Sequence, residues 1–557
     1  MIESGDAPHG RQGKHLLLDL LHSEGVEFIF GNPGTTELPL MDAMVVEDRV
    51  RYILGLNEVI VMGMADGYAQ ATGKLAVCNL HAAPGLGNAM GMLYNAAKAG
   101  APVLVTAGQQ DMSIRLTEPL LWDDLATMAR PLCKWSFEVA SIAELPRAIR
   151  RAAKVALTAP TGPVFLSIPG DILTTEAPAD LDTGSPTRIG PRLRGDAAAI
   201  AAAADMIRAA QCPVIFAGDH VTKSDAHAEL AALATAIGAP VYLEGMANTA
   251  AFPSNHPLYA GTVARMTPAL RAVMEKHDLL ISIGADLLTQ SQATGVEALA
   301  PGTPVVHLDD EPWQIGKNFA AAAAIQGDAK ATLPELTALI GDCGAHRTPG
   351  IIARLAAAKA DLLARAGAMA GDLPLQPMPV LKLIGELLPA DAIVIEELLS
   401  SGMNTVRHLV PAVCPDSWFG MRGGGIGVAI PQAAGIQLAN PGRPVVVLSG
   451  DGSAMYSAAG LWTLAHYKLP VVTVIFNNRG YRILKQRTRA IGDHSARTDT
   501  YVAMDIEQPA IDFMALATAH GVAGVRAETL DEVRAAFTAA LASATPTLIE
   551  ITVARDV

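Results

Sequence analysis

Short runs of aliphatic residues alternate with longer stretches rich in alanine and leucine along nearly the whole chain. Runs such as 445–448 and 471–476 have the length and composition of buried strands, whereas 226–236 has those of a helix. Strands that alternate with helices form parallel sheets with helical crossovers. The pattern therefore predicts an α/β fold.

Two stretches interrupt this alternation, and we interpret both as linkers. Residues 174–194 are rich in Pro, Thr and Asp, and residues 341–379 contain clusters of Gly and Pro. The linkers divide the chain into three doubly wound parallel-sheet domains of ordinary size. We expect these domains at 1–180, 190–345 and 370–557.

The central domain has the pattern of a Rossmann-type sheet. Its expected strands are 213–217, 240–243, 278–283 and 304–308. The first of these strands ends in Phe216-Ala217-Gly218-Asp219-His220, which lacks the Gly-x-Gly-x-x-Gly loop of dinucleotide sites. A bound nucleotide has little support here, and we expect a structural role.

Composition argues against some classes of binding partner. The chain has 557 residues, with 41 Lys and Arg against 55 Asp and Glu, which gives a net charge of −14. This balance argues against nucleic acid or a membrane surface as a partner, and no apolar run reaches the roughly 18 residues of a membrane helix. Residues 1–14 lack the apolar core of a secretory signal, and the five cysteines lie far apart. We expect a cytoplasmic protein.

A β-α-β unit near the C-terminus predicts a metal site. The strand at 444–448 runs into Gly450, Asp451, Gly452 and Ser453, a helix is expected at 454–467, and the strand at 471–476 ends at Asn477-Asn478. Parallel strands place Asp451 and Asn478 at the same ligand-binding edge. Their oxygens suit Mg²⁺, and the backbone N–H groups of the glycine-rich turn suit phosphate. Either motif alone is more simply an ordinary turn.

Three strand ends in the N-terminal domain predict an active-site rim. The strands at 26–30, 52–56 and 75–80 lead to Thr35, Glu58 and His81. The apolar neighbours of Glu58 should exclude water from its carboxyl group. Taken singly, Glu58 is more simply a first-turn acid of the helix expected at 59–71, and His81 a structural histidine. Their common placement favours a functional interpretation.

Together these motifs resemble the thiamine-diphosphate (ThDP) enzymes over essentially the full length. The spacing from Gly450-Asp451-Gly452 to Asn477-Asn478 resembles the family's diphosphate-binding signature, and residues 52–58 resemble its cofactor-activating glutamate segment. Four further motifs resemble benzoylformate decarboxylases in particular. They are Gly31-Asn32-Pro33-Gly34, Leu80-His81-Ala82-Ala83-Pro84-Gly85, Thr106-Ala107-Gly108-Gln109-Gln110 and Gly425-Ile426-Gly427-Val428-Ala429-Ile430-Pro431.

The resemblance implies a role for each candidate residue. Glu58 would hydrogen-bond the pyrimidine of ThDP, while Asp451, Asn478 and the Gly480 carbonyl would bind Mg²⁺. Thr35 and His81 would contact the substrate. The remaining cofactor-binding residues would be Ser400, Gly424, Ile426, Gly450, Gly452, Ser453 and Tyr481.

The same resemblance implies the reaction and the assembly. The expected activity is decarboxylation of a small 2-oxo acid to an aldehyde, by way of an ylid and an enamine on the cofactor. The alternative is an acetolactate synthase-like carboligase that joins the same fragment to an acceptor carbonyl. A non-catalytic relative is disfavoured by the intact Glu58, Asp451 and Asn478. Sites in this family lie between chains, which implies a homodimer or homotetramer.

Two departures from the family pattern concern the substrate. The stretch 284–292 lacks the second active-site histidine of benzoylformate decarboxylases, which mildly favours the carboligase. After Asn478 the chain has Tyr481-Arg482-Ile483-Leu484-Lys485-Gln486-Arg487, a mainly basic stretch with a single aromatic residue. This stretch is either a solvated helix face or a receptor for an anionic substrate tail.

Overall fold

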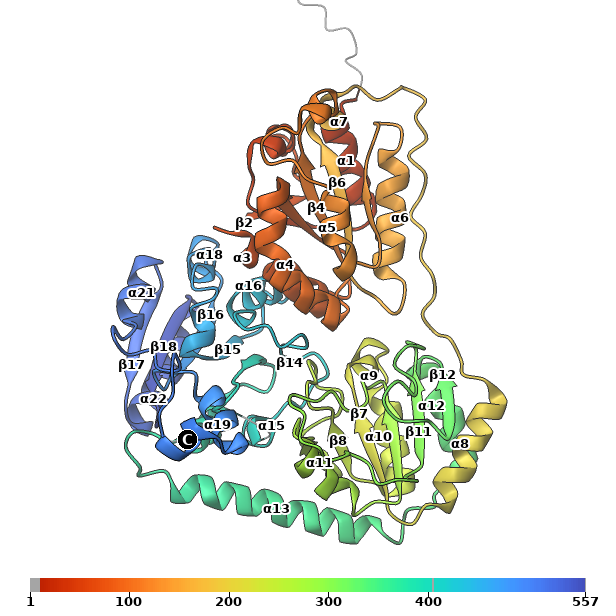
Figure 1. Cartoon of the computed structure of the whole chain (residues 1–557), viewed down its shortest axis with the longest axis vertical. Coiled ribbons are helices and arrows are strands. Elements are labelled where there is room, and N and C mark those ends of the chain that lie inside the picture. The colour runs from red at the N-terminus through yellow and green to blue at the C-terminus, as the bar shows by residue number, and fades with distance from the viewer. Residues whose placement is uncertain (1–10, 403–404, 556–557) are drawn as a thin grey trace, which may run out of the picture. The chain divides into compact units, whose positions relative to one another are not determined.

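The computed structural model describes residues 11–402 and 405–555, so most of the polar stretch at 1–14 lies outside it. The described residues form three six-stranded sheets in which neighbouring strands are parallel, flanked by helices (Figure 1). The predicted α/β class is confirmed. No helix of the described ranges combines the length and the apolar character needed to cross a bilayer.

The first sheet has the strand order β2-β1-β3-β4-β6-β5. Its strands are β1 (Phe28–Gly31), β2 (Arg51–Leu54), β3 (Ala76–His81), β4 (Val103–Gln109), β5 (Ser136–Glu138) and β6 (Val164–Pro169). Its helices are α1 (Gly13–Ser23), α2 (Leu38–Met44), α3 (Glu58–Thr72), α4 (Ala82–Ala99), α5 (Leu125–Ala129), α6 (Leu145–Leu157) and α7 (Gly170–Thr174). The central strands β3, β4 and β6 are almost wholly buried, as expected for strands covered on both faces.

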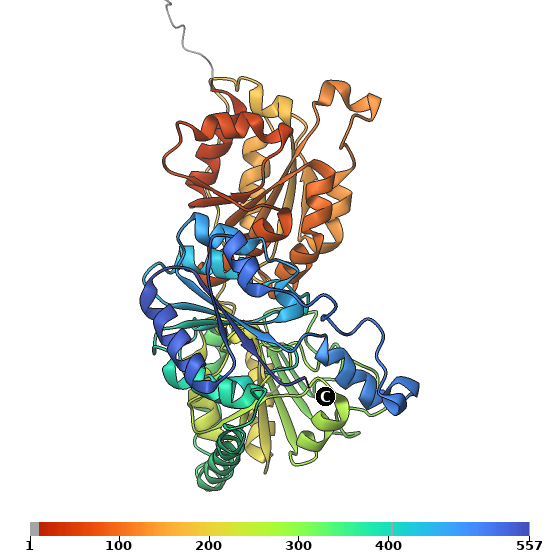
Figure 2. The ribbon, with the colours of Figure 1, turned by 90° about the vertical axis from the view of Figure 1, so that its left-hand side faces the viewer.

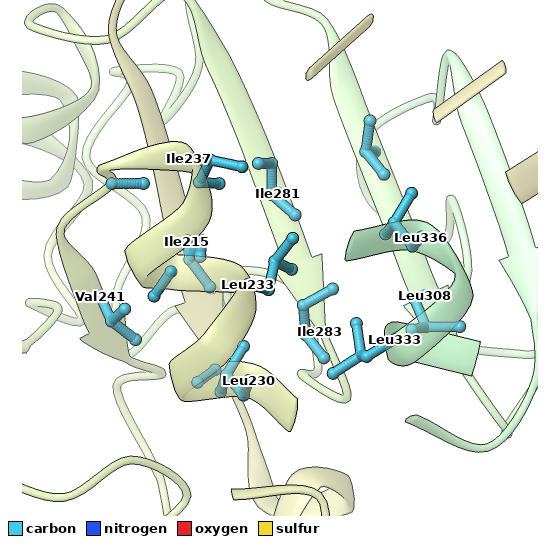
Figure 3. Close-up of a cluster of buried hydrophobic side chains, with 14 of the residues drawn as sticks. Ile215, Leu230, Leu233, Ile237, Val241, Ile281, Ile283, Leu308, Leu333 and Leu336 are labelled. Atoms are coloured by element: carbon cyan, nitrogen blue, oxygen red, sulfur yellow. The ribbon is translucent and has the colours of Figure 1, made fainter. Parts of the chain in front are cut away.

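The second sheet has the order β12-β11-β10-β7-β8-β9. Its strands are β7 (Pro213–Ala217), β8 (Val241–Leu243), β9 (Tyr259–Thr262), β10 (Leu279–Ile283), β11 (Val305–Asp309) and β12 (Ala323–Gln326). Its helices are α8 (Ala197–Ala209), α9 (Asp219–Lys223), α10 (His227–Ile237), α11 (Thr267–Met274) and α12 (Ala329–Ile340). Figure 3 shows Leu and Ile side chains of α10 and α12 packed against β7, β8, β10 and β11, which forms the core on that face.

The third sheet has the order β14-β13-β15-β16-β18-β17. Its strands are β13 (Ile393–Glu397), β14 (Trp418–Phe419), β15 (Val445–Gly450), β16 (Val471–Asn477), β17 (Ala523–Ala527) and β18 (Thr547–Thr552). The helices of this part of the sequence are α14 (Pro377–Leu387), α15 (Val406–Leu409), α16 (Ala429–Ala439), α17 (Asp451–Ala454), α18 (Gly460–His466), α19 (Arg482–Ile491), α20 (His494–Thr498), α21 (Phe513–Ala519) and α22 (Leu530–Ser543).

The described residues divide into two compact units. One comprises the residues up to Ile189 together with Ile430–Pro441 and Ala459–Tyr467, which carry α16 and α18. Within it α16 crosses α3 closely, because a Cβ added at Gly67 would lie 2.4 Å from the Gln432 carbonyl oxygen. Gln432 also donates a hydrogen bond of 2.8 Å to Asp66. The other unit holds the second and third sheets.

The connection predicted as a linker at 341–379 is largely helical. Helix α13 spans Thr348–Ala368, a run of 21 residues rich in Ala and Leu, and is seen lengthwise in Figure 1 and nearly end-on in Figure 2. These residues are strong helix formers, so the segment is helical although only Leu362 and Ala366 are buried in it. The predicted linker thus contains a long, mostly exposed helix in the sequence between the second and third sheets.

The single helix predicted at 454–467 is two helices. The one-turn helix α17 ends at Ala454, and α18 begins at Gly460. Ser457 and Gly460 are weak helix formers. The turn between the helices also packs on the glycine of another loop, since a Cβ added at Gly427 would lie 2.4 Å from that of Tyr456. Helix propensity and this packing together end the first helix.

Candidate active site

The three candidates of the first sheet lie at one edge. Strand β1 pairs Gly31 with Leu54 of β2 and with Asn79 of β3, so all three strands end at nearly the same level. Glu58 is the first residue of α3, and His81 is the last residue of β3. A Cβ added at Gly85 of α4 would lie 3.2 Å from Glu58 Oε1 and 3.6 Å from the His81 Cβ. Both side chains therefore border the same glycine.

Glu58 is buried at the N-terminus of a long helix. Only 9% of the residue is exposed, and Asn88 of α4 donates a hydrogen bond of 3.1 Å to Oε2. The preceding Asn57 caps α3 by accepting a hydrogen bond of 3.1 Å from the Ile60 N–H. Because Asn57 caps the helix, the Glu58 carboxylate is free to act in the site.

His81 is held by a carboxylate that the sequence analysis did not single out. Its Nδ1 lies 2.9 Å from Glu37 Oε2 and 3.0 Å from Thr36 Oγ1. Glu37 is 2% exposed and also accepts hydrogen bonds of 2.9 Å from the N–H groups of Gly34 and Gly108. A carboxylate only accepts hydrogen bonds, so Nδ1 carries the proton and Nε2 is the ring atom left for other partners.

The predicted Thr35 is exposed beside this pair. The threonine that bonds His81 is its buried neighbour Thr36. The glycine before them is required by packing, because a Cβ added at Gly34 would lie 2.2 Å from the His81 ring carbon Cγ. The motif thus brings backbone and imidazole into contact and leaves Thr35 at the surface.

In the third sheet Asp451 and Asn478 lie at the ends of β15 and β16, which are adjacent and parallel. Asp451 is 3% exposed, and its Oδ2 accepts a hydrogen bond of 3.1 Å from the Gly480 N–H. Burial raises the pKa of Asp451 to about 6, against the opposing effect of backbone N–H donors from Gly452, Gly480 and Arg479. A cation at this carboxylate would offset the cost of its desolvation.

The two asparagines after β16 have different surroundings. Asn477 donates a hydrogen bond of 2.7 Å to Glu550 and accepts one of 3.0 Å from the Arg479 N–H. Asn478 is equally buried, yet its Oδ1 has no hydrogen-bond partner among the described residues. A buried acceptor without a donor is costly unless a ligand satisfies it. Asp451 and this orphan oxygen fit a hard cation such as Mg²⁺.

The glycine-rich turn at Asp451 is compact. A Cβ added at Gly452 would lie 2.6 Å from the ring of Tyr481, so the glycine lets this predicted cofactor residue pack on the turn. Ser453 is buried and Gly450 is partly buried. The helix that follows is a single turn, which is shorter than the sequence predicted.

A second residue that sequence reasoning missed holds the loop with Gly424 and Ile426. Glu397, the last residue of β13, is 1% exposed and accepts hydrogen bonds from the N–H groups of Gly427, Val428 and Ala429. Gly424 has φ +75°, which a glycine adopts without strain. Ile426 and Ser400 are partly exposed. The only sequence signal for Glu397 was an acidic residue at the end of a strand.

The same loop is tied to the second sheet by an ion-pair network. Arg422 lies 2.9 Å from Asp286 and donates a hydrogen bond of 2.9 Å to Glu244. Burial raises the pKa of Glu244 to about 7, although the charge of Arg422 opposes this. Asp286 belongs to the stretch 284–292 that lacks the family's second histidine. In this chain that stretch anchors the loop before Gly424.

Comparisons with known proteins cover all three sheets. Residues 11–127 match "Thiamine pyrophosphate enzyme, N-terminal TPP binding domain", residues 200–336 match the central domain, and residues 400–551 match the C-terminal TPP binding domain. Benzoylformate decarboxylase of Pseudomonas aeruginosa is 33% identical over 534 residues, which is 96% of this chain and 97% of the relative.

Two further relatives also match nearly the full length of this chain. The acetolactate synthase large subunit of Parasynechococcus marenigrum is 32% identical over 99% of this chain and 89% of its own length. The solved structure of a ThDP-dependent 4-hydroxybenzoylformate decarboxylase from Rhodococcus jostii is 31% identical, with a TM-score of 0.88 over 98% of this chain and 100% of that chain. On these matches the chain belongs to the thiamine pyrophosphate enzyme family.

Proposed function

We propose that the protein is a ThDP- and Mg²⁺-dependent decarboxylase that converts a 2-oxo acid to CO₂ and an aldehyde in the cytoplasm. The observation that carries the proposal is the buried Glu58 carboxylate at the start of α3. It accepts a hydrogen bond from Asn88, and it is not the N-cap of the helix, because Asn57 has that role. The full-length likeness to benzoylformate decarboxylases supports the reaction type. When bound, ThDP supplies the carbon nucleophile and the electron sink for loss of CO₂.

The chain's own residues would hold the cofactor and move protons. Glu58 would hydrogen-bond N1′ of the aminopyrimidine and share a proton there, which its burial from water favours. Asp451, the orphan Oδ1 of Asn478 and the Gly480 carbonyl would bind Mg²⁺. The remaining predicted contacts to the cofactor are Ser400, Gly424, Ile426, Gly450, Gly452, Ser453 and Tyr481.

His81 is suited to proton transfer at the substrate. Because its Nδ1–H is directed to Glu37, its Nε2 is the nitrogen that can accept or return a proton. Decarboxylation to an aldehyde requires a proton at the carbon that loses CO₂, and Nε2 would provide it. Thr35, exposed beside the pair, would contact the substrate carboxylate.

One observation favours the alternative, an acetolactate synthase-like carboligase. The stretch 284–292 offers no second histidine, and its Asp286 is committed to Arg422. A site with one fewer proton donor would leave more time for an acceptor carbonyl to react. The sequence identity to an acetolactate synthase large subunit is nearly as high as the sequence identity to a benzoylformate decarboxylase.

A panel of 2-oxo acids with product identification tests the proposal. The holoenzyme should release CO₂ and aldehyde, detected by a coupled carbonate assay and by NMR of the products. Accumulation of a 2-hydroxyketone or acetohydroxy acid as the main product would favour the carboligase. Absence of CO₂ release from every aromatic, aliphatic and dicarboxylic acid of the panel would contradict both.

A further inference from the structure

A cavity of about 300 Å³ lies in the unit that holds the second and third sheets. Its walls come from the end of β13, the segments after β8 and β9, and helices α11, α15 and α19. Side chains of both sheets line it, including Thr262, Arg265, Met266, Met421, Ile483 and Arg487. This volume suits a small ligand with a short chain.

The cavity adjoins the residues predicted to bind the cofactor. Its wall includes Leu399, which directly precedes Ser400, and Ile483, which is three residues after Gly480. These segments follow β13 and β16 at the edge where Asp451 and Asn478 also lie. A substrate reacting at the cofactor could therefore extend its far end into this cavity.

Two arginines make the cavity attractive to anions. Arg265 and Arg487 both line it. Burial and then the charge of Arg487 lower the pKa of Arg265, and the charge of Glu396, on the same wall, opposes this. Within the described ranges neither guanidinium has a carboxylate oxygen within 4.0 Å. The printed partner of Arg265 is the Met246 sulfur at 2.9 Å, a weak and uncharged acceptor.

The other charges of the wall already have partners. Arg407 donates to the carbonyl oxygens of Ala247 and Thr249 and packs over Trp418 at 4.8 Å. Glu397 is engaged by the backbone of the loop at 427–429. Glu396 accepts a hydrogen bond of 2.8 Å from the Leu398 N–H, and burial raises the pKa of its carboxyl group. Among the described residues the wall thus offers two arginines without an ion-pair partner within 4.0 Å, and two carboxyl groups, Glu396 and Glu397, that already accept backbone hydrogen bonds.

The basic helix α19 divides into two groups by its partners. Lys485 pairs with Asp505, and Arg489 pairs with Asp499 at 2.8 Å and with the Tyr501 hydroxyl at 2.9 Å. Arg487 instead lines the cavity with Ile483, one helical turn before it. The solvated-face interpretation fits Lys485 and Arg489, and the anion-receptor interpretation fits Arg487.

We propose that Arg265 and Arg487 bind a second anionic group at the far end of the substrate, so that the preferred substrate is a short-chain 2-oxo dicarboxylic acid. The inference rests on the proposed function and specifies its substrate class. Guanidinium groups bind carboxylates through paired, charge-assisted hydrogen bonds, and two of them on one cavity wall would select a terminal carboxylate over a methyl group.

The test compares two acids of equal chain length, 2-oxoadipate and 2-oxohexanoate, which differ only in the terminal carboxylate. For the holoenzyme, kcat/KM for 2-oxoadipate should exceed that for 2-oxohexanoate by at least about tenfold, mainly through KM. In Arg487→Gln and Arg265→Gln this ratio should fall about tenfold or more. Arg489→Gln, a control on the same helix whose partners are Asp499 and Tyr501, should keep the ratio.

The possible failures are distinguishable. Turnover of 2-oxohexanoate or benzoylformate with no preference for 2-oxoadipate would overturn the inference and leave the proposed function standing. An unchanged preference in both arginine variants would also overturn it. If no 2-oxo acid is turned over, the proposed function fails, and calorimetry with adipate still tests the cavity: binding by the wild-type protein and its loss in Arg487→Gln would support the anion site, and no binding would overturn it.

Discussion

The adjacent residues Asn477 and Asn478 differ in their hydrogen-bond partners and therefore in their roles. Asn477 uses both ends of its amide inside the protein, toward Glu550 and the Arg479 N–H. Asn478 leaves a buried oxygen without a protein partner among the described residues. The first residue therefore stabilises the sheet edge, and the second is available to a ligand.

This difference predicts opposite effects of the same substitution. Asn477→Ala removes a donor from the buried Glu550 and should lower the stability of the cofactor-free protein by about 1–3 kcal/mol. Asn478→Ala should leave that stability nearly unchanged and weaken the joint binding of ThDP and Mg²⁺ at least about tenfold. Thermal unfolding and titration calorimetry measure the two effects. Loss of stability in Asn478→Ala with normal cofactor binding would contradict the assignment.

Substitution of Glu58 should affect the affinity for ThDP and the turnover number differently. Glu58→Gln keeps the size of the side chain and a hydrogen bond to the pyrimidine, but it cannot share a proton there. The affinity for ThDP should change only a few-fold, and kcat should fall by about 10²-fold or more.

Glu27→Gln is the matched control in the same domain, because Glu27 is an exposed partner of Lys74. It should leave both quantities unchanged. Calorimetry with ThDP and Mg²⁺ and steady-state decarboxylation measure the two variants. Undiminished turnover in Glu58→Gln would refute the proposed proton transfer.

At the scale of elements, the last residue of strand β13 fixes the loop that contains Gly424 and Ile426. Glu397 receives backbone N–H groups from the loop at 427–429 and the Ser449 hydroxyl at 3.2 Å. Arg422 holds the start of the same loop through Glu244 and Asp286. The loop is thus anchored at both ends by buried ionisable side chains, Arg422 and Glu397.

The raised pKa of Glu397 predicts that the free energy of unfolding depends on pH. Burial raises its pKa to about 7 from 4.5, although the N–H donors oppose this, so the folded protein retains a proton that the unfolded chain releases between these values. The stabilisation is complete below pH 4.5 and is lost as the pH rises through about 7, by up to roughly 3 kcal/mol. Unfolding of wild type and Glu397→Gln at pH 5 and 8 measures it.

The difference in stability between wild type and Glu397→Gln should shift against the wild type as the pH rises. The exposed Glu528→Gln is the control and should follow the wild type at both pH values. Parallel curves for wild type and Glu397→Gln would show that Glu397 does not titrate in this range.

The sequence predicted the strands better than the connections between them. Strand β7 lies exactly where the run of aliphatic residues placed it, and β16 differs by one residue, because buried parallel strands are continuous apolar runs. The break between α17 and α18 depends on contact between Tyr456 and Gly427, 29 residues earlier in the sequence, so local composition does not reveal it. Glu37 and Glu397 were missed for the same reason, since their partners come from distant segments.

At the scale of the whole molecule, the candidate residues divide between the two compact units. Thr35, Glu58 and His81 belong to the unit of the first sheet, whereas Asp451, Asn478 and Gly480 belong to the unit of the second and third sheets. No single unit carries both the proposed activating carboxylate and the proposed metal ligands. We propose that the two halves of a working site come from different chains of a homodimer or homotetramer.

Mixing two inactive variants tests this arrangement. Glu58→Gln disables one half-site and Asp451→Ala the other, and each homo-oligomer should have little activity. If the halves pair between chains, a mixed dimer contains one site with both residues intact and one with neither. Because random exchange makes half of the dimers mixed, refolding or co-expressing the two variants in equal amounts should restore about a quarter of wild-type activity. If the halves pair within one chain, every site keeps one defect and no activity returns. Mixing Glu58→Gln with Asn478→Ala should restore activity in the same way, whereas mixing Asp451→Ala with Asn478→Ala should not, because both defects then lie in the same half.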